Sequence, residues 1–196
     1  LSTGHVTTDA GASLDVTGTL TLNGDVTYKG SGAGATISGN VDLGAATRTF
    51  TVGDSTAAAD DLTVSANISG SGGLTKAGPG TMVLTGTNSY SGPTTVSAGI
   101  LWPASSAALP GYDSAGNVVV NGGTLAVRGG WVNVCNKVGT RGNLVVEGTG
   151  DMTVRDTVTV AYNATNCSGT VILRDGGRLA VGGEFLVAHF SKTIGE

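Results

Sequence analysis

Apolar and polar residues alternate in short runs through the middle of the chain, and glycine-rich segments separate these runs. Between residues 70 and 101 the runs cover 74–75, 81–85 and 94–97. Turn-forming residues lie between them, as in Gly78-Pro79-Gly80. A period of two with β-branched side chains is typical of strands, and glycine clusters are typical of tight corners. The pattern therefore predicts short strands here and no helix.

The same alternation recurs at a fixed distance in the C-terminal part. Residues 142–154 align without gaps on residues 169–181, an offset of 27, and residues 158–160 continue the match onto 185–187. A third copy begins at residue 116 and needs small gaps. Each copy has three pairs of apolar positions, which we expect to point inward. They are Val118, Val120, Leu125, Val127, Val132 and Val134; then Leu144, Val146, Met152, Val154, Val158 and Val160; then Val171, Leu173, Leu179, Val181, Phe185 and Val187.

A repeat of about 27 residues with three strands is the signature of a solenoid. One coil cannot bury its inward face alone, whereas coils stacked about 4.8 Å apart share a continuous core. We therefore predict an all-β fold, a right-handed parallel β-helix of about seven three-sided coils, with residues 1–196 as one solenoid segment. The N-terminal part is similar but less regular. We expect residues 54–61 and 102–116 to be loops that leave the coils.

The stretch 70–101 resembles, nearly end to end, the autotransporter-associated β-strand repeat of bacterial passenger domains. Met82 replaces a leucine of the usual pattern and Pro93 replaces a glycine. The resemblance implies a parallel β-helix on the outside of a bacterium, and it implies no reaction. The matching residues are Gly70, Gly72, Gly73, Leu74, Lys76, Gly78, Gly80, Thr81, Leu84, Gly86, Asn88, Tyr90, Gly92, Thr94, Val96, Gly99 and Leu101.

Charge is sparse along the chain. Charged residues make up 12% of it and the net charge is −4, so we expect no binding to nucleic acid. No run approaches the roughly 18 apolar residues of a membrane-spanning helix, so we expect no membrane insertion by this segment. The sequence shows neither an initiator methionine nor a signal peptide. We interpret it as a piece of a longer extracellular or cell-surface protein, or as a unit that stacks on copies of itself.

The chain has two cysteines, Cys135 and Cys167. They occupy corresponding connections of neighbouring predicted coils, which lie side by side, so a disulfide is feasible. It closes a loop of about 32 residues and stabilises by about 3 to 4 kcal/mol on the chain-entropy model. The alternative is two unrelated thiols, one of them buried as a small apolar residue. The cysteine spacing fits no zinc pattern, and we expect neither a metal site nor a cofactor.

A β-helix can also carry an enzyme that cleaves polysaccharides, which needs converging carboxylates. Asp60-Asp61 is an adjacent acidic pair, and it falls in a predicted loop. Glu147 with Arg174, and Asp151 with Arg178, occupy equivalent positions in neighbouring coils, which favours cross-coil ion pairs over catalysis. Threonines at alternate positions, at 17–21 and 47–51, do not recur at one coil position in this alignment. We attribute them to β-propensity rather than to an ice-binding face.

One outward feature points to a contact surface. Val119, Val145 and Ile172 occupy matching outward positions in successive coils, where they predict an apolar stripe. The alternative is that β-branched side chains simply fill strand positions. Aromatic residues near the predicted loop at 102–116 can contact sugars or protein, or can pack the loop down. These aromatic residues are Trp102, Tyr112 and Trp131.

Together these patterns favour a structural or adhesive β-helix segment, such as a stalk, an adhesin or a fibre component, without catalysis. The expected partners are neighbouring coils of the same or an identical chain, and surface glycans or proteins. The alternative is a polysaccharide-binding or polysaccharide-cleaving β-helix protein.

Overall fold

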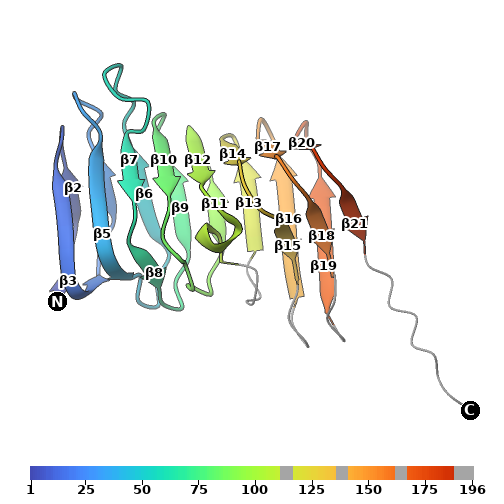
Figure 1. The fold of residues 1–196 in the computed structure, drawn as a ribbon, viewed down its shortest axis with the longest axis horizontal. Coiled ribbons are helices and arrows are strands. Elements are labelled where there is room, and N and C mark those ends of the chain that lie inside the picture. Colours follow the sequence, from blue (N-terminus) through green and yellow to red (C-terminus); the bar gives the residue numbers. More distant parts are fainter. Residues whose placement is uncertain (111–116, 136–140, 162–166, 188–196) are drawn as a thin grey trace, which may run out of the picture.

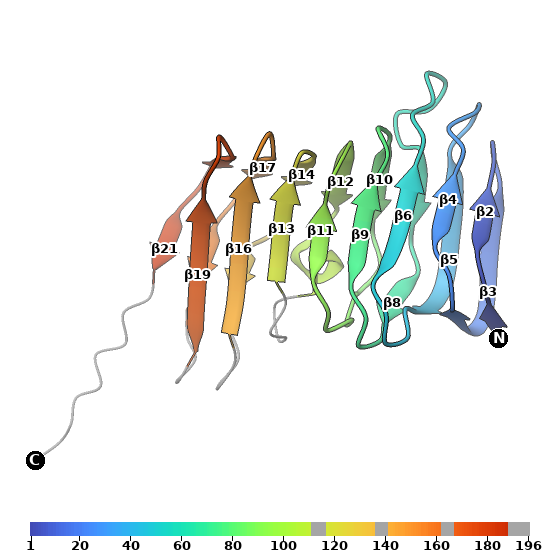
Figure 2. The same ribbon diagram turned by 180° about the vertical axis from the view of Figure 1, so that it is seen from behind.

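Short strands stack along a rod, with the N-terminus at one end and the last strand toward the other (Figures 1 and 2). The computed structural model describes residues 1–110, 117–135, 141–161 and 167–187. Within these residues every paired strand is parallel to its neighbour, and one short 3-10 turn, η1 (Ser106–Ala108), interrupts the strands. The predicted all-β solenoid with stacked parallel strands is confirmed.

Two long sheets form two sides of the rod. The first sheet contains β1 (Ser2–Thr3), β3 (Ser13–Leu22), β5 (Ala35–Asp42), β7 (Leu62–Val64), β10 (Thr81–Leu84), β12 (Ile100–Pro103), β14 (Thr124–Val127), β17 (Asp151–Val154) and β20 (Arg178–Val181), with β8 (Asn67–Ser69) paired to β5. The second sheet contains β2 (Val6–Thr8), β4 (Val26–Tyr28), β6 (Arg48–Val52), β9 (Leu74–Ala77), β11 (Thr94–Val96), β13 (Asn117–Asn121), β16 (Arg141–Glu147) and β19 (Ser168–Leu173).

The third side changes along the rod. In the C-terminal coils it is a separate sheet of β15 (Val132–Val134), β18 (Val158–Val160) and β21 (Phe185–Val187). In the first coils the strands β3 and β5 bend around the corner near Gly18 and Gly39 and supply both sides. Between these regions, Asn88 N–H donates to Ala107 O across two irregular segments.

The coil length varies, whereas the sequence repeat predicts about 27 residues throughout. Val6 pairs with Val26, 20 positions later, and Leu74 pairs with Thr94, again 20 positions later. Val120 pairs with Val146, 26 positions later. The 27-residue spacing is confirmed between the last two coils, where Leu144 pairs with Val171. The short coils have compact corners or an irregular third side. Their strands still pair in register with the strands of the longer coils.

The inward positions predicted for the C-terminal coils form continuous columns. Val118, Leu144 and Val171 are paired in register, as are Leu125, Met152 and Leu179. Leu144, Val146 and Met152 are buried, as predicted. Leu173, Phe185 and Val187 are exposed instead, because no described coil covers the outer side of the last rung.

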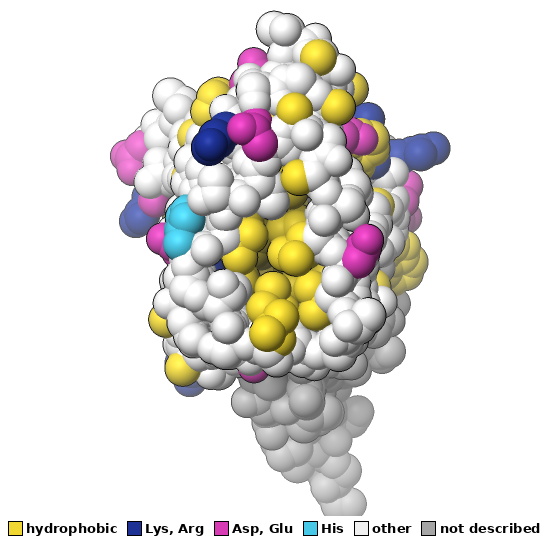
Figure 3. Space-filling view, turned by 90° about the vertical axis from the view of Figure 1, so that its left-hand side faces the viewer, with side chains coloured by type: hydrophobic (Ala, Val, Ile, Leu, Met, Phe, Trp, Pro, Cys, Tyr) yellow, Lys and Arg dark blue, Asp and Glu magenta, His cyan; other side chains and the backbone are white. Residues whose placement is uncertain are grey.

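The core runs along the axis of the rod. Seen from the N-terminal end, apolar side chains fill its centre inside a wall of polar surface (Figure 3). The largest buried side chains include Tyr28, Phe50 and Met82. Each apolar side chain taken from water contributes about 1.5 to 3 kcal/mol, so stacking of coils is the main source of stability.

The two predicted loops have different outcomes. Residues 54–61 connect β6 to β7, as expected, and Ser55 N–H donates to the Asp61 carboxylate at 2.8 Å to close the loop. The prediction for 102–116 is wrong at its start, because Trp102 and Pro103 belong to β12. Residues 108–110 are buried against the rod. The remaining residues, 111–116 with Tyr112, lie outside the described residues.

Candidate functional site

The predicted apolar stripe lies on the outer face of the second sheet. Val119 pairs with Val145 and Val145 pairs with Ile172, in three successive coils. Val119 and Val145 are half-buried, and Ile172 is 36% exposed. Polar columns border the stripe: Asn143 donates to Asn117 on one side, and Asn121 donates to Glu147 on the other. The structure thus places the three residues in one column.

The same column continues toward the N-terminus as threonine. Thr49 pairs with Thr75 and Thr75 pairs with Thr95, which pairs with Val119. In the neighbouring outward column Thr7, Thr27 and Thr51 are stacked. The expectation that the threonines at 47–51 do not recur at one coil position is therefore wrong for Thr49 and Thr51. It assumed a constant coil length, and the coils here vary.

Trp102 lies on the outer face of the first sheet, between Val83 and the neighbouring β14. The Arg128 guanidinium lies over its indole ring, 3.8 Å from the ring centroid. The indole nitrogen of Trp102 is buried without a hydrogen-bond partner among the described residues. Trp131 precedes β15 and is 49% exposed. Arg128 was missed at the sequence level, because only the fold brings it onto a ring 26 residues earlier.

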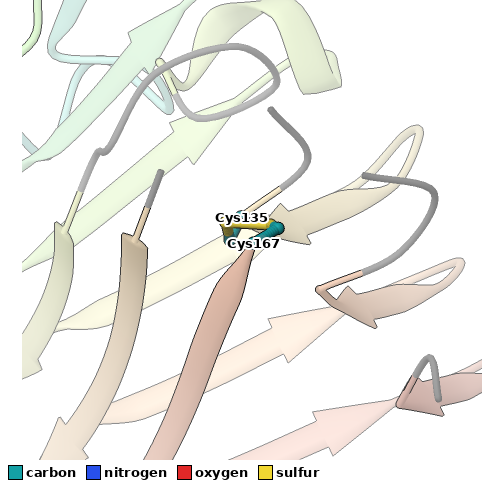
Figure 4. The surroundings of a disulfide bond; sticks show 2 residues. All are labelled: Cys135 and Cys167. Carbon is teal, nitrogen blue, oxygen red and sulfur yellow. A yellow bond between two sulfur atoms is a disulfide. The ribbon is translucent and has the colours of Figure 1, made fainter. Parts of the chain in front are cut away.

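Cys135 and Cys167 are joined by a disulfide (Figure 4). Their Cα atoms are 6.1 Å apart, within the usual range for a disulfide. Cys135 follows β15 and Cys167 precedes β19, so the bond links the connections of two neighbouring coils. Oxidation of the protein in solution stays a prediction.

The predicted cross-coil ion pairing is present at one of two places. The Arg174 guanidinium forms a salt bridge with Glu147, and its Nε donates to the same carboxylate at 2.6 Å. Asp151 and Arg178 are register partners, but no salt bridge joins them in the described part of the chain. Asp60-Asp61 does not form a paired carboxylate site, because Asp61 is buried and accepts hydrogen bonds from Ser55 N–H and Thr81 N–H.

Lys76 of the central repeat is buried in an inward column, between Phe50 and Val96. Its Nζ donates to Ala77 O at 3.0 Å, Gly78 O at 2.8 Å and Ala98 O at 3.1 Å. Burial lowers the pKa of Lys76 to about 8, and the Asp61 carboxylate opposes this shift. The side chain therefore links two corners of adjacent coils. The alternation itself signalled this position, since it puts residue 76 on the same side as residue 74.

Two further polar residues of the repeat are buried on its third side. The Asn88 side chain accepts from Ile68 N–H at 2.8 Å and donates to Ala108 O at 2.6 Å, so it joins the coils before and after its own. The Tyr90 and Thr94 hydroxyls are hydrogen-bonded at 2.7 Å. Burial raises the pKa of Tyr90, and the hydrogen bond with Thr94 lowers it in part. These side chains fix an irregular segment at the position where the C-terminal coils have a strand.

The described ranges contain no group of three or more His, Cys, Asp or Glu side chains placed to hold a metal ion. No helix within them is long and apolar enough to cross a bilayer.

The fold and its polar corners define a class: a parallel β-solenoid built on a passenger-type repeat. The passenger-associated-transport-repeat family matches residues 74–102, which contain Lys76, Asn88 and Tyr90. The predicted resemblance is thereby confirmed. This match and the similarity to an autotransporter adhesin indicate a cell-surface or extracellular protein associated with the outer membrane.

The chain is similar to a curated protein, the adhesin BmaC autotransporter of Brucella suis biovar 1 (strain 1330). The two sequences are 32% identical over an alignment of 183 residues, and the match covers 83% of this chain and 5% of the relative. The chain therefore spans about 5% of the length of the curated relative it matches. No solved structure gives a significant match.

Proposed function

We propose that this chain is a structural and adhesive stretch of an autotransporter passenger, in which the rod supplies reach and its outer surface supplies contact, without a reacting centre. The observation that carries the proposal is the continuous parallel pairing from β2 to β19, which gives one outer face along the whole rod. The adhesin relative supports the adhesive part. The buried and backbone-bonded state of Asp61 speaks against the acidic pair that a polysaccharide-cleaving alternative would use.

The stripe of Val119, Val145 and Ile172 is one proposed contact surface on this rod. An apolar column bordered by polar columns suits a lateral contact with a protein or with a second rod. Stripe residues at successive coils lie about 4.8 Å apart, so a partner meets a rigid and regular row. Trp102 on the first sheet and Trp131, just before β15 of the third sheet, provide a second proposed contact surface.

Adhesion is tested with beads that carry the chain, applied to mammalian epithelial cells and to bacterial cells. We expect the coated beads to adhere to one of these surfaces and Val145→Lys to reduce adherence, because a charge interrupts the stripe. Thr49→Lys is the matched control, since Thr49 occupies the same outward column outside the stripe. No adherence above that of uncoated beads would overturn the adhesive role. Equal adherence of both variants and the unmodified chain would discard the stripe.

A further inference from the structure

Two arginines leave the rod side by side at the corner between the first and third sheets. Arg128 follows β14 and Arg155 follows β17, one position beyond the register pair Val127–Val154. Arg155 N–H donates to Val127 O at 2.9 Å, which fixes this alignment. Val127 and Val154 point inward, so both arginines point outward, and both are exposed. Their side chains therefore start about 4.8 Å apart along the rod axis.

Within the described ranges no salt bridge joins a carboxylate to either arginine. The salt bridges there join Lys29 to Asp9 and join Arg174 to Glu147 and Asp175. Asp156 lies at the same corner, where one of its oxygens accepts from Gly130 N–H at 2.8 Å. Like charges on neighbouring strands repel each other, so the corner is stabilised when an anion binds between the two guanidinium groups.

One aromatic ring contacts Arg128, and a second aromatic residue follows Arg128 closely in the chain. The Trp102 ring holds the Arg128 guanidinium at 3.8 Å, which orients its planar donor edge and lowers the entropy cost of binding. Trp131 follows Arg128 by three positions and is 49% exposed. An exposed indole in a chain with 5% aromatic residues offers a flat apolar face, on which a sugar ring can stack.

We propose that Arg128, Arg155 and Trp131 bind an acidic polysaccharide, with Trp102 as a positioning residue for Arg128. Sulfate or carboxylate groups of the polysaccharide contact the two guanidinium groups at successive coils, and a sugar ring stacks on Trp131. Arginine suits this task because its planar fork donates two parallel hydrogen bonds to such groups. The inference rests on the proposed adhesive function and names the ligand class of one surface.

Binding is measured by titrating the full 196-residue chain and following its tryptophan fluorescence and heat of binding. Heparin is the sulfated probe, polygalacturonate the carboxylated probe and dextran the neutral one. We expect one or both acidic probes to bind and dextran not to bind. The double variant Arg128→Ala/Arg155→Ala should weaken that binding by at least about tenfold and lower its salt dependence. Trp131→Ala should weaken binding and leave the salt dependence unchanged.

Arg141→Ala/Arg178→Ala is the matched control, because it removes two other exposed arginines and the same net charge. We expect it to bind like the unmodified chain. Dextran binding as tight as that of the acidic probes, no binding of either acidic probe, or equal losses in the two double variants would overturn the proposal. Far-UV circular dichroism confirms that each variant is folded. Bead adherence distinguishes failure of the polysaccharide site from failure of the proposed function. If the beads adhere and no polysaccharide binds, the site alone is rejected. If the beads do not adhere, the adhesive role is rejected.

Discussion

The central coil of residues 74–93 and the C-terminal coils of residues 117–187 close the same solenoid in different ways. The C-terminal coils have three strands each, apolar inward columns and a disulfide between two connections. The central coil is 20 residues long, and buried polar side chains hold its corner and its irregular third side. A shorter coil leaves more backbone groups without a strand partner, and side chains from the repeat satisfy them.

The largest expected effect concerns the disulfide. We expect Cys135→Ser/Cys167→Ser to lower the free energy of unfolding by about 3 to 4 kcal/mol, since a loop of 32 residues is no longer closed in the unfolded chain. Urea unfolding followed by circular dichroism measures the loss. Addition of reductant to the unmodified chain is the control and should give the same loss. Two free thiols by alkylation and mass measurement would contradict the bond.

The buried side chain of Asn88 stabilises the central coil. Asn88→Ala removes the one side chain that bonds both Ile68 N–H and Ala108 O. These two backbone groups are then buried without hydrogen bonds. We expect a loss of about 2 to 3 kcal/mol in the free energy of unfolding, with faster hydrogen exchange in residues 67–69. Asn143→Ala is the matched control, because Asn143 is exposed in the regular region, and it should cost less than about 0.5 kcal/mol. Similar losses in both variants would show that the buried amide has no special role.

Lys76 gives the central coil a pH dependence. Its pKa is about 8 in the folded state and 10.5 for an unperturbed lysine, so the unfolded chain binds more protons between these pH values. The free energy of unfolding should therefore rise as the pH increases from about 8 to 10.5, by about 2 kcal/mol. Unfolding curves across this range should show the rise in the unmodified chain and in the exposed-lysine control Lys29→Met. Lys76→Met should lack the rise. A rise of equal size in Lys76→Met would assign it to another group.

The smallest effect is expected at the exposed ion pair. Glu147→Gln removes the charge that pairs with Arg174 in the regular region. We expect a change of at most about 1 kcal/mol, decreasing as salt is added, because both solvent and ions screen a surface pair. Thermal unfolding at low and high salt measures it. A large loss of stability that salt does not alter would mean that the coil needs this ion pair in order to fold.

The apolar columns of the C-terminal coils could be predicted from sequence because each is a period-two pattern repeated at a constant offset. The last rung shows the limit of that pattern, since alternation marks Leu173 as inward, and its burial needs a covering coil. The stripe of Val119, Val145 and Ile172 was also within reach. The threonine columns were not, because their register depends on coil lengths that range from 19 to 27 residues.

The polar elements required the fold. Lys76 and Asn88 were recognised as residues of the repeat, but their partners lie on neighbouring coils, in positions that a single repeat does not specify. The outward pair Arg128 and Arg155 was missed because each arginine by itself is an ordinary exposed residue. The register of β14 and β17 brings the two together.

Distances between spin labels show whether one outward column runs in register along the rod. Labels at Thr49 and Thr95 are two coils apart, at Thr49 and Val119 three, and at Thr49 and Val145 four. In a continuous solenoid the backbone separations grow by about 4.8 Å per coil, to about 19 Å for the last pair, with a narrow distribution. Separations that do not increase with coil number, or broad distributions at every pair, would contradict a continuous parallel solenoid.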